Sequence, residues 1–176
     1  MNFYTADCHF FHRAILEYEN RPFPSVDEMN EEMIKKWNKK VKAKDAVYIL
    51  GDFSFGKPEL TEALLDRLNG KKYLIIGNHD YFAHHKNFDK TKFEWIKAYH
   101  TLSENVSGET YHVILFHYPI AAWERSHYGS IHLYGHLHSN EGSHRRLDFE
   151  LKNAFNVGVD VRNFEPVSLK EILNKS

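Results

Sequence analysis

Five short runs of apolar residues mark this chain, and a polar residue follows each run within two positions. The runs cover residues 3–6, 46–50, 73–76, 113–116 and 131–134. Continuous rather than alternating hydrophobicity is typical of strands that are buried on both faces. Sites in layered α/β proteins gather at the carboxyl ends of strands, so we expect the polar residues that follow these runs to converge.

Two further segments have apolar residues at helical spacing. In the first, Ser25 and Glu28 match a capping box, and the apolar positions behind it recur every four residues, which predicts one apolar helix face. Those positions are Met29, Met33, Trp37 and Val41. Residues 58–68 predict a second helix, whose apolar side consists of Leu60, Leu64, Leu65 and Leu68. A short helix is predicted near residues 168–173.

The chain has 176 residues, enough to bury a hydrophobic core, and no repeat or linker divides it. We therefore expect a single domain over residues 1–176. The alternation of strands and helices predicts an α/β fold. No apolar run approaches the length of a membrane span, roughly 18 residues or more, and the first residues do not resemble a signal peptide. The expectation is a cytoplasmic protein with no membrane partner.

Charge and cysteine content limit which binding partners and which kinds of site the chain can have. A formal net charge of -1 gives no global electrostatic argument for binding nucleic acid. Cys8 is the only cysteine, which excludes an internal disulfide and a thiolate-rich zinc site. The 13 histidines are a reason to look for metal ligands or acid–base chemistry.

The polar residues after the apolar runs form five groups. The groups are Asp7-Cys8-His9, Gly51-Asp52, Gly77-Asn78-His79-Asp80, His117 and Gly135-His136-Leu137-His138. Their carboxylate, imidazole and amide ligands suit Mn²⁺, Fe²⁺, Zn²⁺ or Ni²⁺. In an extended segment, Asp-x-His and His-x-His place both side chains on one side, because the strand period is two residues.

In this order, the five groups resemble the calcineurin-like metallophosphoesterase family over residues 7–138. Flanking segments resemble a small phage-like branch of that family, and they include Arg21-Pro22-Phe23, Leu50-Gly51-Asp52-Phe53 and Asn156-Val157-Gly158-Val159-Asp160. The resemblance implies two packed β-sheets flanked by helices, the four-layer αββα metallophosphoesterase fold. It also suggests helical insertions around residues 12–43 and 81–100.

The resemblance further implies two divalent metal ions. One ion would take Asp7, His9, Asp52 and His138. The other would take Asp52, Asn78, His117 and His136, so that Asp52 bridges the pair. A metal-bridging hydroxide would attack phosphorus. His79 would protonate the leaving group, and Asp80 could orient the His79 imidazole.

One position departs from the family pattern. Many members carry a second aspartate three residues after the bridging one, and here Phe55 stands in that place. Asp52 itself is present, so what is lost is an orienting group for His9 or His79, a role that Ser54 or another residue could take.

His12 is either a loop histidine or a substrate contact. Arg21, Arg145 and Arg146 read more readily as surface or ion-paired residues than as phosphate contacts.

Three functions fit these residues. The leading interpretation is a metal-dependent phosphoesterase that hydrolyses phosphomonoesters or phosphodiesters. Under it, a manganese-dependent phosphodiesterase is one expectation, and the substrate is a small ester for which a nucleotide-like group stays open. A nuclease with the same binuclear centre is the second, so nucleic acid stays open as a partner. A non-catalytic, metal-stabilised binding module is the third, although it leaves His79 unexplained. The sequence gives no indication of oligomeric state.

Overall fold

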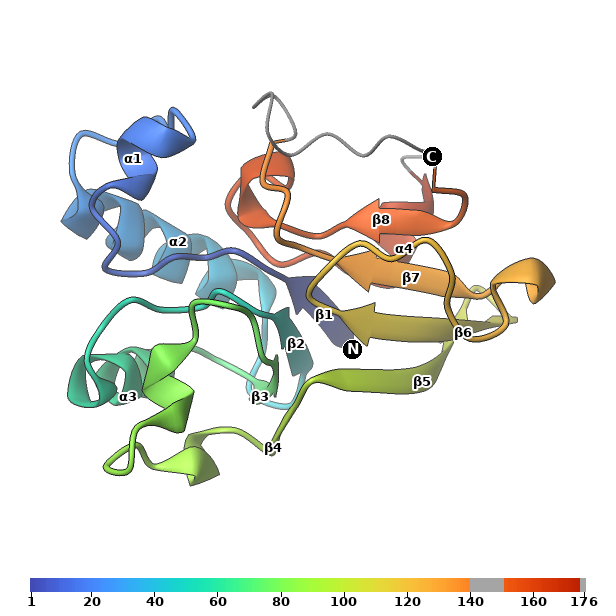
Figure 1. Ribbon diagram of the computed structural model, residues 1–176, viewed down its shortest axis with the longest axis horizontal. Helices are drawn as coiled ribbons and strands as arrows, with labels where there is room; N and C mark the ends of the chain where they lie inside the picture. The colour runs from blue at the N-terminus through green and yellow to red at the C-terminus, as the bar shows by residue number, and fades with distance from the viewer. Residues whose placement is uncertain (140–150, 175–176) are drawn as a thin grey trace.

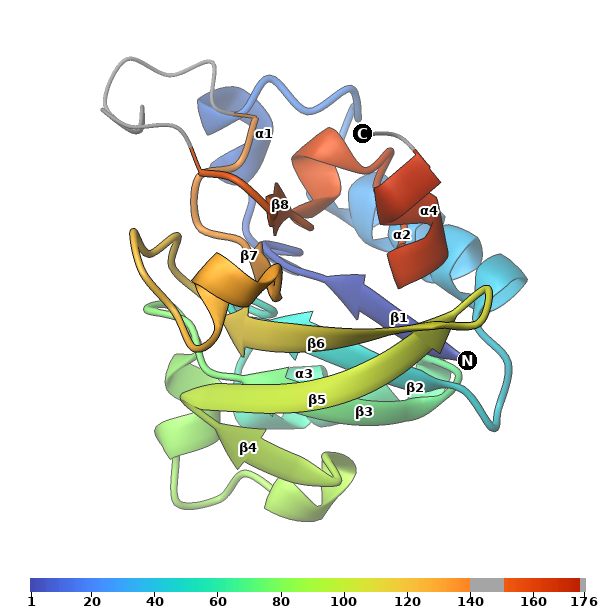
Figure 2. The same ribbon diagram turned by 90° about the vertical axis from the view of Figure 1, so that its right-hand side faces the viewer.

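The computed structural model describes residues 1–139 and 151–174. Two four-stranded sheets pack together with helices outside them (Figures 1 and 2). The first sheet contains β1 (Asn2–Thr5), β2 (Ala46–Leu50), β3 (Lys71–Ile75) and β4 (Trp95–Lys97), in that order. The second contains β5 (Tyr99–Val106), β6 (Glu109–Phe116), β7 (Ile131–Tyr134) and β8 (Ala154–Asn156). The α/β two-sheet sandwich that the family resemblance implied is confirmed.

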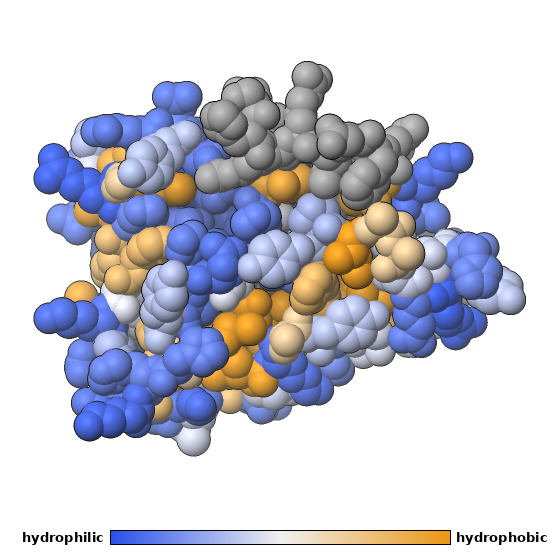
Figure 3. Space-filling view, viewed as in Figure 1, coloured by the Kyte–Doolittle hydropathy of each residue, from blue (hydrophilic) through white to orange (hydrophobic). Residues whose placement is uncertain are grey.

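Strand direction brings the polar groups to one edge of the molecule. All neighbours in the first sheet are parallel. In the second sheet β5 and β6 form an antiparallel hairpin, whereas β6, β7 and β8 run parallel. The carboxyl ends of parallel strands meet at one edge. In space-filling form, hydrophilic side chains gather just beyond the arrowheads of β6 and β7, next to an oblique apolar strip (Figure 3).

The helices are α1 (Ile15–Tyr18), α2 (Val26–Lys40), α3 (Pro58–Arg67) and α4 (Leu169–Asn174). Short 3₁₀ helices lie at η1 (Tyr81–His84), η2 (Lys90–Lys92), η3 (Ser126–Tyr128) and η4 (Val159–Val161). Ser25 caps α2 by accepting a hydrogen bond from the backbone N–H of Glu28, as predicted. Within the described residues, no helix has the length and apolar character of a membrane span.

Two hydrophobic cores stabilise the sheets. The first joins the outer face of the first sheet to α2 and α3, and it contains the predicted apolar positions Met29, Met33, Trp37 and Val41. The second lies between the sheets, where Tyr4 and Leu50 pack with Leu115 and Leu133, and Leu169 of α4 joins them. The strands are therefore held from both sides, which fixes the positions of the loops at their ends.

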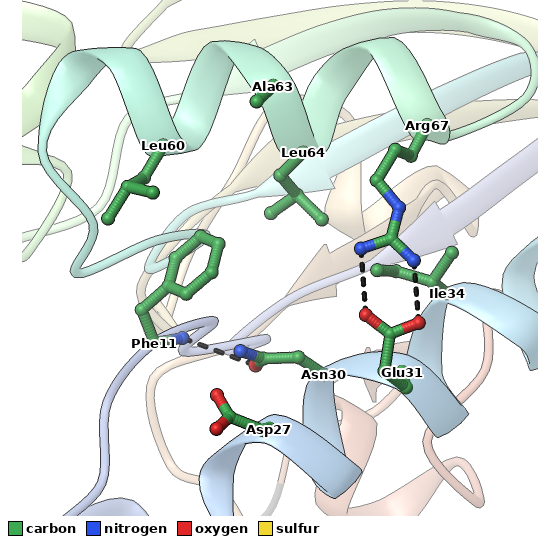
Figure 4. A pocket seen from close by; sticks show the side chains of 9 residues that line it. All are labelled: Phe11, Asp27, Asn30, Glu31, Ile34, Leu60, Ala63, Leu64 and Arg67. Atoms are coloured by element: carbon green, nitrogen blue, oxygen red, sulfur yellow. Dashed lines mark hydrogen bonds and ion pairs between the residues drawn. The ribbon is translucent and has the colours of Figure 1, made fainter.

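Two parts of the predicted element pattern were wrong. Leu60 is 51% exposed and faces a groove between α2 and α3, because Thr61 takes the inward position on that turn (Figure 4). Residues 81–100 do not form a helical insertion. They contain two 3₁₀ helices and the edge strand β4, which pairs with β3.

Candidate metal centre

Five of the seven predicted ligands sit on left-handed backbone rather than on extended strands. The φ angles are 54° at Asp7, 51° at His9, 51° at Asp52, 70° at His136 and 51° at His138. The side chains do lie together, but the predicted reason, the two-residue period of a strand, was wrong. Positive φ costs a non-glycine residue roughly 1–2 kcal/mol, and strained residues cluster at functional sites. Five such residues at one edge mark this edge as a site.

The backbones of neighbouring loops are joined directly. The N–H of Asp7 donates to the Gly51 carbonyl and the N–H of His9 donates to the Asp52 carbonyl, both at 3.0 Å. The N–H of His136 in turn donates to the Asp7 carboxylate at 2.8 Å. These bonds connect the ends of β1, β2 and β7, so both sheets contribute to one rigid site.

Potential metal ligands converge in two groups. Ligand atoms within each group lie within 4.8 Å of one another, and the groups are Asp7, His9 and His138, and Asp52, His117 and His136. Oδ2 of Asp52 lies 3.7 Å from Nε2 of His9 and 3.7 Å from Nε2 of His117. Asp52 is thus placed between the groups, where a bridging carboxylate would stand.

Asn78 completes the set of seven predicted ligands. Its Oδ1 lies 3.1 Å from Nε2 of His117 and accepts a long hydrogen bond from the Tyr118 hydroxyl. The structure therefore brings all seven residues to one edge, and their assignment as ligands stays a prediction.

Contacts at Nδ1 orient two of the imidazoles. Nδ1 of His117 lies 2.7 Å from the Leu50 carbonyl oxygen, and Nδ1 of His138 lies 2.8 Å from Oδ2 of Asp160. A proton on each Nδ1 satisfies these oxygens and leaves Nε2 as the atom that can bind a metal. Nε2 of His9 is buried without any hydrogen-bond partner among the described residues. A buried, unpartnered nitrogen among carboxylates and imidazoles fits a divalent cation.

Asp160 and Arg21 support this arrangement, and sequence reasoning did not assign them. The Arg21 guanidinium donates to both carboxylate oxygens of Asp160 at 2.7 and 2.9 Å. It also donates to the backbone carbonyls of Asp7 and Cys8. Both residues lie in segments that resemble the phage-like branch, which was the available signal.

Burial and charge shift the acid–base properties of the site. Burial raises the pKa of Asp7 to about 6, although the neighbouring His138 and His117 oppose the shift. Burial lowers the pKa of His138, but the hydrogen bond to Asp160 and the nearby carboxylates outweigh it, so the net shift is upward. Burial therefore disfavours charge on Asp7, whereas Asp160 stabilises positive charge on His138.

Asp80, predicted to orient the His79 imidazole, contacts backbone groups of two loops. Its carboxylate accepts hydrogen bonds from the backbone N–H groups of Asp52, Phe53 and Gly77 at 3.0, 2.8 and 2.7 Å. Burial raises its pKa to about 6. With three backbone donors on its oxygens, Asp80 joins the loops after β2 and β3, and its role toward the His79 imidazole stays a prediction.

The predicted proton donor His79 borders an open cleft of about 290 Å³. Its backbone N–H donates to Oδ1 of Asp52 at 2.8 Å, which ties its position to the centre of the site. The cleft is lined by His9, His12, Ile15, Tyr18, Asp52, Phe55, Asn78, His79, His136 and His138. Ser54 does not replace the missing carboxylate, because its hydroxyl contacts Thr61 and accepts from the Gly56 N–H.

The other histidines and arginines considered in the sequence lie in different surroundings. His12 faces the cleft, whereas His132 is fully buried with Nε2 3.1 Å from the Tyr118 carbonyl oxygen. Of the two readings left open for Arg21, surface or ion-paired, the structure shows a buried ion pair. Arg145 and Arg146 lie outside the described residues.

Comparison with known proteins gives a consistent result. The family model described as "Calcineurin-like phosphoesterase" matches residues 4–145. An uncharacterized protein of Methanocaldococcus jannaschii, MJ1445, is 36% identical over 170 residues, covering 96% of this chain and 86% of that protein. The Gene 66 protein of Mycobacterium phage L5 is 29% identical, covering 89% of this chain and 85% of that protein.

A solved structure has the same fold. The protein of unknown function AQ665 from Aquifex aeolicus superposes with a TM-score of 0.72 at 22% sequence identity. The superposition covers 100% of this chain and 99% of that chain. At this identity the likeness concerns the fold alone.

Proposed function

Because this chain belongs to the calcineurin-like phosphoesterase family, we propose that it is a metal-dependent hydrolase of phosphate esters. One observation carries the proposal: two groups of candidate ligands meet around Asp52 at the shared edge of both sheets. Hydrolysis of a phosphomonoester or phosphodiester at this edge is the reaction that best uses the donor set.

The proposed ligands follow the two groups. Asp7, His9, Asp52 and His138 would hold one cation, and Asp52, Asn78, His117 and His136 would hold the other. Mn²⁺, Fe²⁺, Zn²⁺ and Ni²⁺ all suit oxygen and imidazole ligands. When bound, such a pair would neutralise phosphate oxygens and activate water for attack on phosphorus.

His79 is the proposed acid for the departing group. Its position beside Asn78, with its backbone tied to Asp52, holds the imidazole at the rim of the same cleft. The oxygen that leaves phosphorus carries negative charge and needs a proton. A histidine at the rim can supply it and recover it from solvent.

The size of the cleft supports a small substrate. A cleft of about 290 Å³ is at the lower end of ligand pockets, which run from roughly 300 to 1,000 Å³. Hydrolysis of bis-p-nitrophenyl phosphate, p-nitrophenyl phosphate and single-stranded DNA, each with Mn²⁺, tests the substrate class. We expect turnover of the nitrophenyl esters. Degradation of DNA alone would indicate the nuclease alternative.

The His79→Ala variant tests the acid. Removing a general acid costs roughly 10²–10⁴-fold in rate, so kcat should fall while Mn²⁺ binding stays at the wild-type level. The exposed histidine His85 offers a matched control, and His85→Ala should retain full turnover. Wild-type turnover in His79→Ala would contradict the assignment.

A further inference from the structure

His12 contacts the candidate ligand His9 but is not one of the seven predicted ligands. Its backbone N–H donates to the His9 carbonyl at 3.1 Å, which closes a tight turn. Its Nδ1 lies 3.1 Å from Nδ1 of His9. Two imidazole nitrogens at this distance form a hydrogen bond only when one carries a proton and the other does not. The tautomer of one ring therefore determines the tautomer of the other.

The surroundings of His9 decide which nitrogen carries the proton. A metal binds the unprotonated nitrogen of a neutral imidazole. In His9 that atom is Nε2, which is buried without a hydrogen-bond partner among the described residues and lies 3.7 Å from Oδ2 of Asp52. If Nε2 is unprotonated, the proton is on Nδ1, and His9 donates it to Nδ1 of His12.

The other two oriented histidines support donation from Nδ1 of His9 to Nδ1 of His12. Nδ1 of His117 faces the Leu50 carbonyl oxygen, and Nδ1 of His138 faces the Asp160 carboxylate. In both cases an acceptor at Nδ1 leaves Nε2 turned toward the metal groups. At His9 no oxygen atom takes that place in the described part of the chain, and a nitrogen of His12 takes it instead.

Aromatic stacking holds His12 in the required orientation. Its ring lies parallel to Phe55, with centroids 3.9 Å apart and planes inclined by 8°. Phe55 also stacks on His9 at 5.0 Å, so one phenyl ring packs against both imidazoles. Phe55 occupies the place where the family pattern has a carboxylate, and the stacked pair supplies the orientation that the carboxylate would have given.

We propose that His12 is a positioning residue that accepts the Nδ1 proton of His9 and so keeps Nε2 of His9 available to a divalent cation. This inference rests on the proposed function. As a consequence, the proton of His12 is on its own Nε2. No protein group among the described residues hydrogen-bonds to that atom, and His12 lines the cleft, so its N–H can donate to an oxygen of the bound ester.

Three variants distinguish the contributions of Nδ1 and Nε2 of His12. In His12→Phe the stacked ring is retained without either nitrogen. In His12→Asn an amide oxygen stands near the position of Nδ1 and can accept from His9. In His12→Gln the amide reaches toward the position of Nε2. His127→Phe is the matched control, because His127 is exposed and also packs on an aromatic ring, that of Tyr128.

The test is calorimetric titration of each chelator-treated protein with Mn²⁺, followed by steady-state kinetics on bis-p-nitrophenyl phosphate. Loss of a group that orients a metal ligand typically weakens metal affinity roughly 10–100-fold. We expect such a loss in His12→Phe and His12→Gln, and near wild-type Mn²⁺ affinity in His12→Asn and His127→Phe. His12→Asn should show a raised KM, since it lacks the Nε2 donor.

The outcomes distinguish this inference from the proposed function. If the wild type binds no divalent cation, the proposed function fails. If the wild type binds Mn²⁺ and His12→Phe binds it equally well, the positioning role is overturned while the proposed function stands. If His12→Asn weakens Mn²⁺ binding as much as His12→Phe does, acceptance at Nδ1 is not the cause, and the inference is likewise overturned. An unchanged KM in His12→Asn would overturn the substrate contact.

Discussion

Arg21 and Asp160 are a buried charge pair that links the backbone of the first loop to a candidate ligand. Their side chains are 0% and 4% exposed, and the guanidinium also reaches the backbone carbonyls of Asp7 and Cys8. Burial raises the pKa of Asp160, but its hydrogen bonds with His138 and Arg21 outweigh burial and give a net lowering. Asp160 therefore stays ionised and holds Nδ1 of His138.

The variant Asp160→Asn should weaken both stability and metal binding. Leaving Arg21 buried without its partner costs roughly 3–5 kcal/mol of unfolding free energy. Loss of the carboxylate behind His138 should lower Mn²⁺ affinity roughly 10–100-fold. Urea unfolding and Mn²⁺ titration measure the two effects. Asp66→Asn, which removes an exposed partner of Lys92, should cost at most about 1 kcal/mol. Equal behaviour of the two variants would contradict this role for Asp160.

The sequence was informative about candidate ligands because each one follows an apolar run. It gave Asp160 no role, although its segment resembles the phage-like branch. Its partner Arg21 lies 139 positions away, and no local pattern reports such a contact. The left-handed backbone of Asp7 and His9 was also missed, because local spacing fits an extended segment equally well. Asp80 was noticed, but its backbone partners could be known only from the fold.

At the level of elements, the ends of β2 and β3 approach so closely that they require glycine. An added Cβ on Gly77 would stand 2.5 Å from the backbone nitrogen of Asp52 and would also meet that residue's side chain. The short distance permits the Asp80 carboxylate to join both loops. The separation of these two strand ends therefore determines where Asp52 lies.

Gly77→Ala should displace Asp52 and reduce Mn²⁺ affinity together with turnover. Crowding of this kind costs roughly 1–3 kcal/mol. Gly108→Ala is a useful control, since Gly108 has a φ of 91° with nothing within 4 Å of an added Cβ. That control should lose stability through backbone strain and keep wild-type metal binding. Full metal affinity in Gly77→Ala would show that the close approach is not needed.

Strand prediction succeeded for the continuous apolar runs and missed the partly exposed strands β4 and β5. Strands β2 and β7 are continuous apolar runs, and they were found. Strand β5 is partly exposed along its length and exists because it pairs with β6, so its own hydrophobicity carries little signal. The Ser107-Gly108 turn, with φ angles of 54° and 91°, was the available indication of that hairpin.

At the level of the whole molecule, the candidate site belongs to both sheets. Its loops follow β1, β2 and β3 of the first sheet and β6 and β7 of the second. The Gly135 N–H donates to the His117 carbonyl at 2.9 Å, which joins the last two loops. Two cations held here would connect the sheets, so metal binding and global stability should be coupled. This shared site also supports our proposal that residues 1–176 form one domain.

Mn²⁺ should therefore raise the melting temperature of the chelator-treated protein. Ligand at 100 times its Kd stabilises the folded state by about 2.7 kcal/mol, which corresponds to roughly 5–10 °C for a domain of this size. Differential scanning calorimetry measures the shift, with NaCl at equal ionic strength as the control. Asp52→Asn should lose most of it. A melting temperature that does not respond to Mn²⁺ would contradict the coupling between metal binding and the stability of the fold.

The most direct test of the account is the metal requirement for ester hydrolysis. Wild-type protein is stripped with a chelator, and its turnover of bis-p-nitrophenyl phosphate is measured before and after Mn²⁺ is restored, alongside Asp52→Asn. The account predicts loss of turnover in the stripped protein, recovery with Mn²⁺ in the wild type, and no recovery in the variant. Full turnover by protein that contains no metal would contradict it.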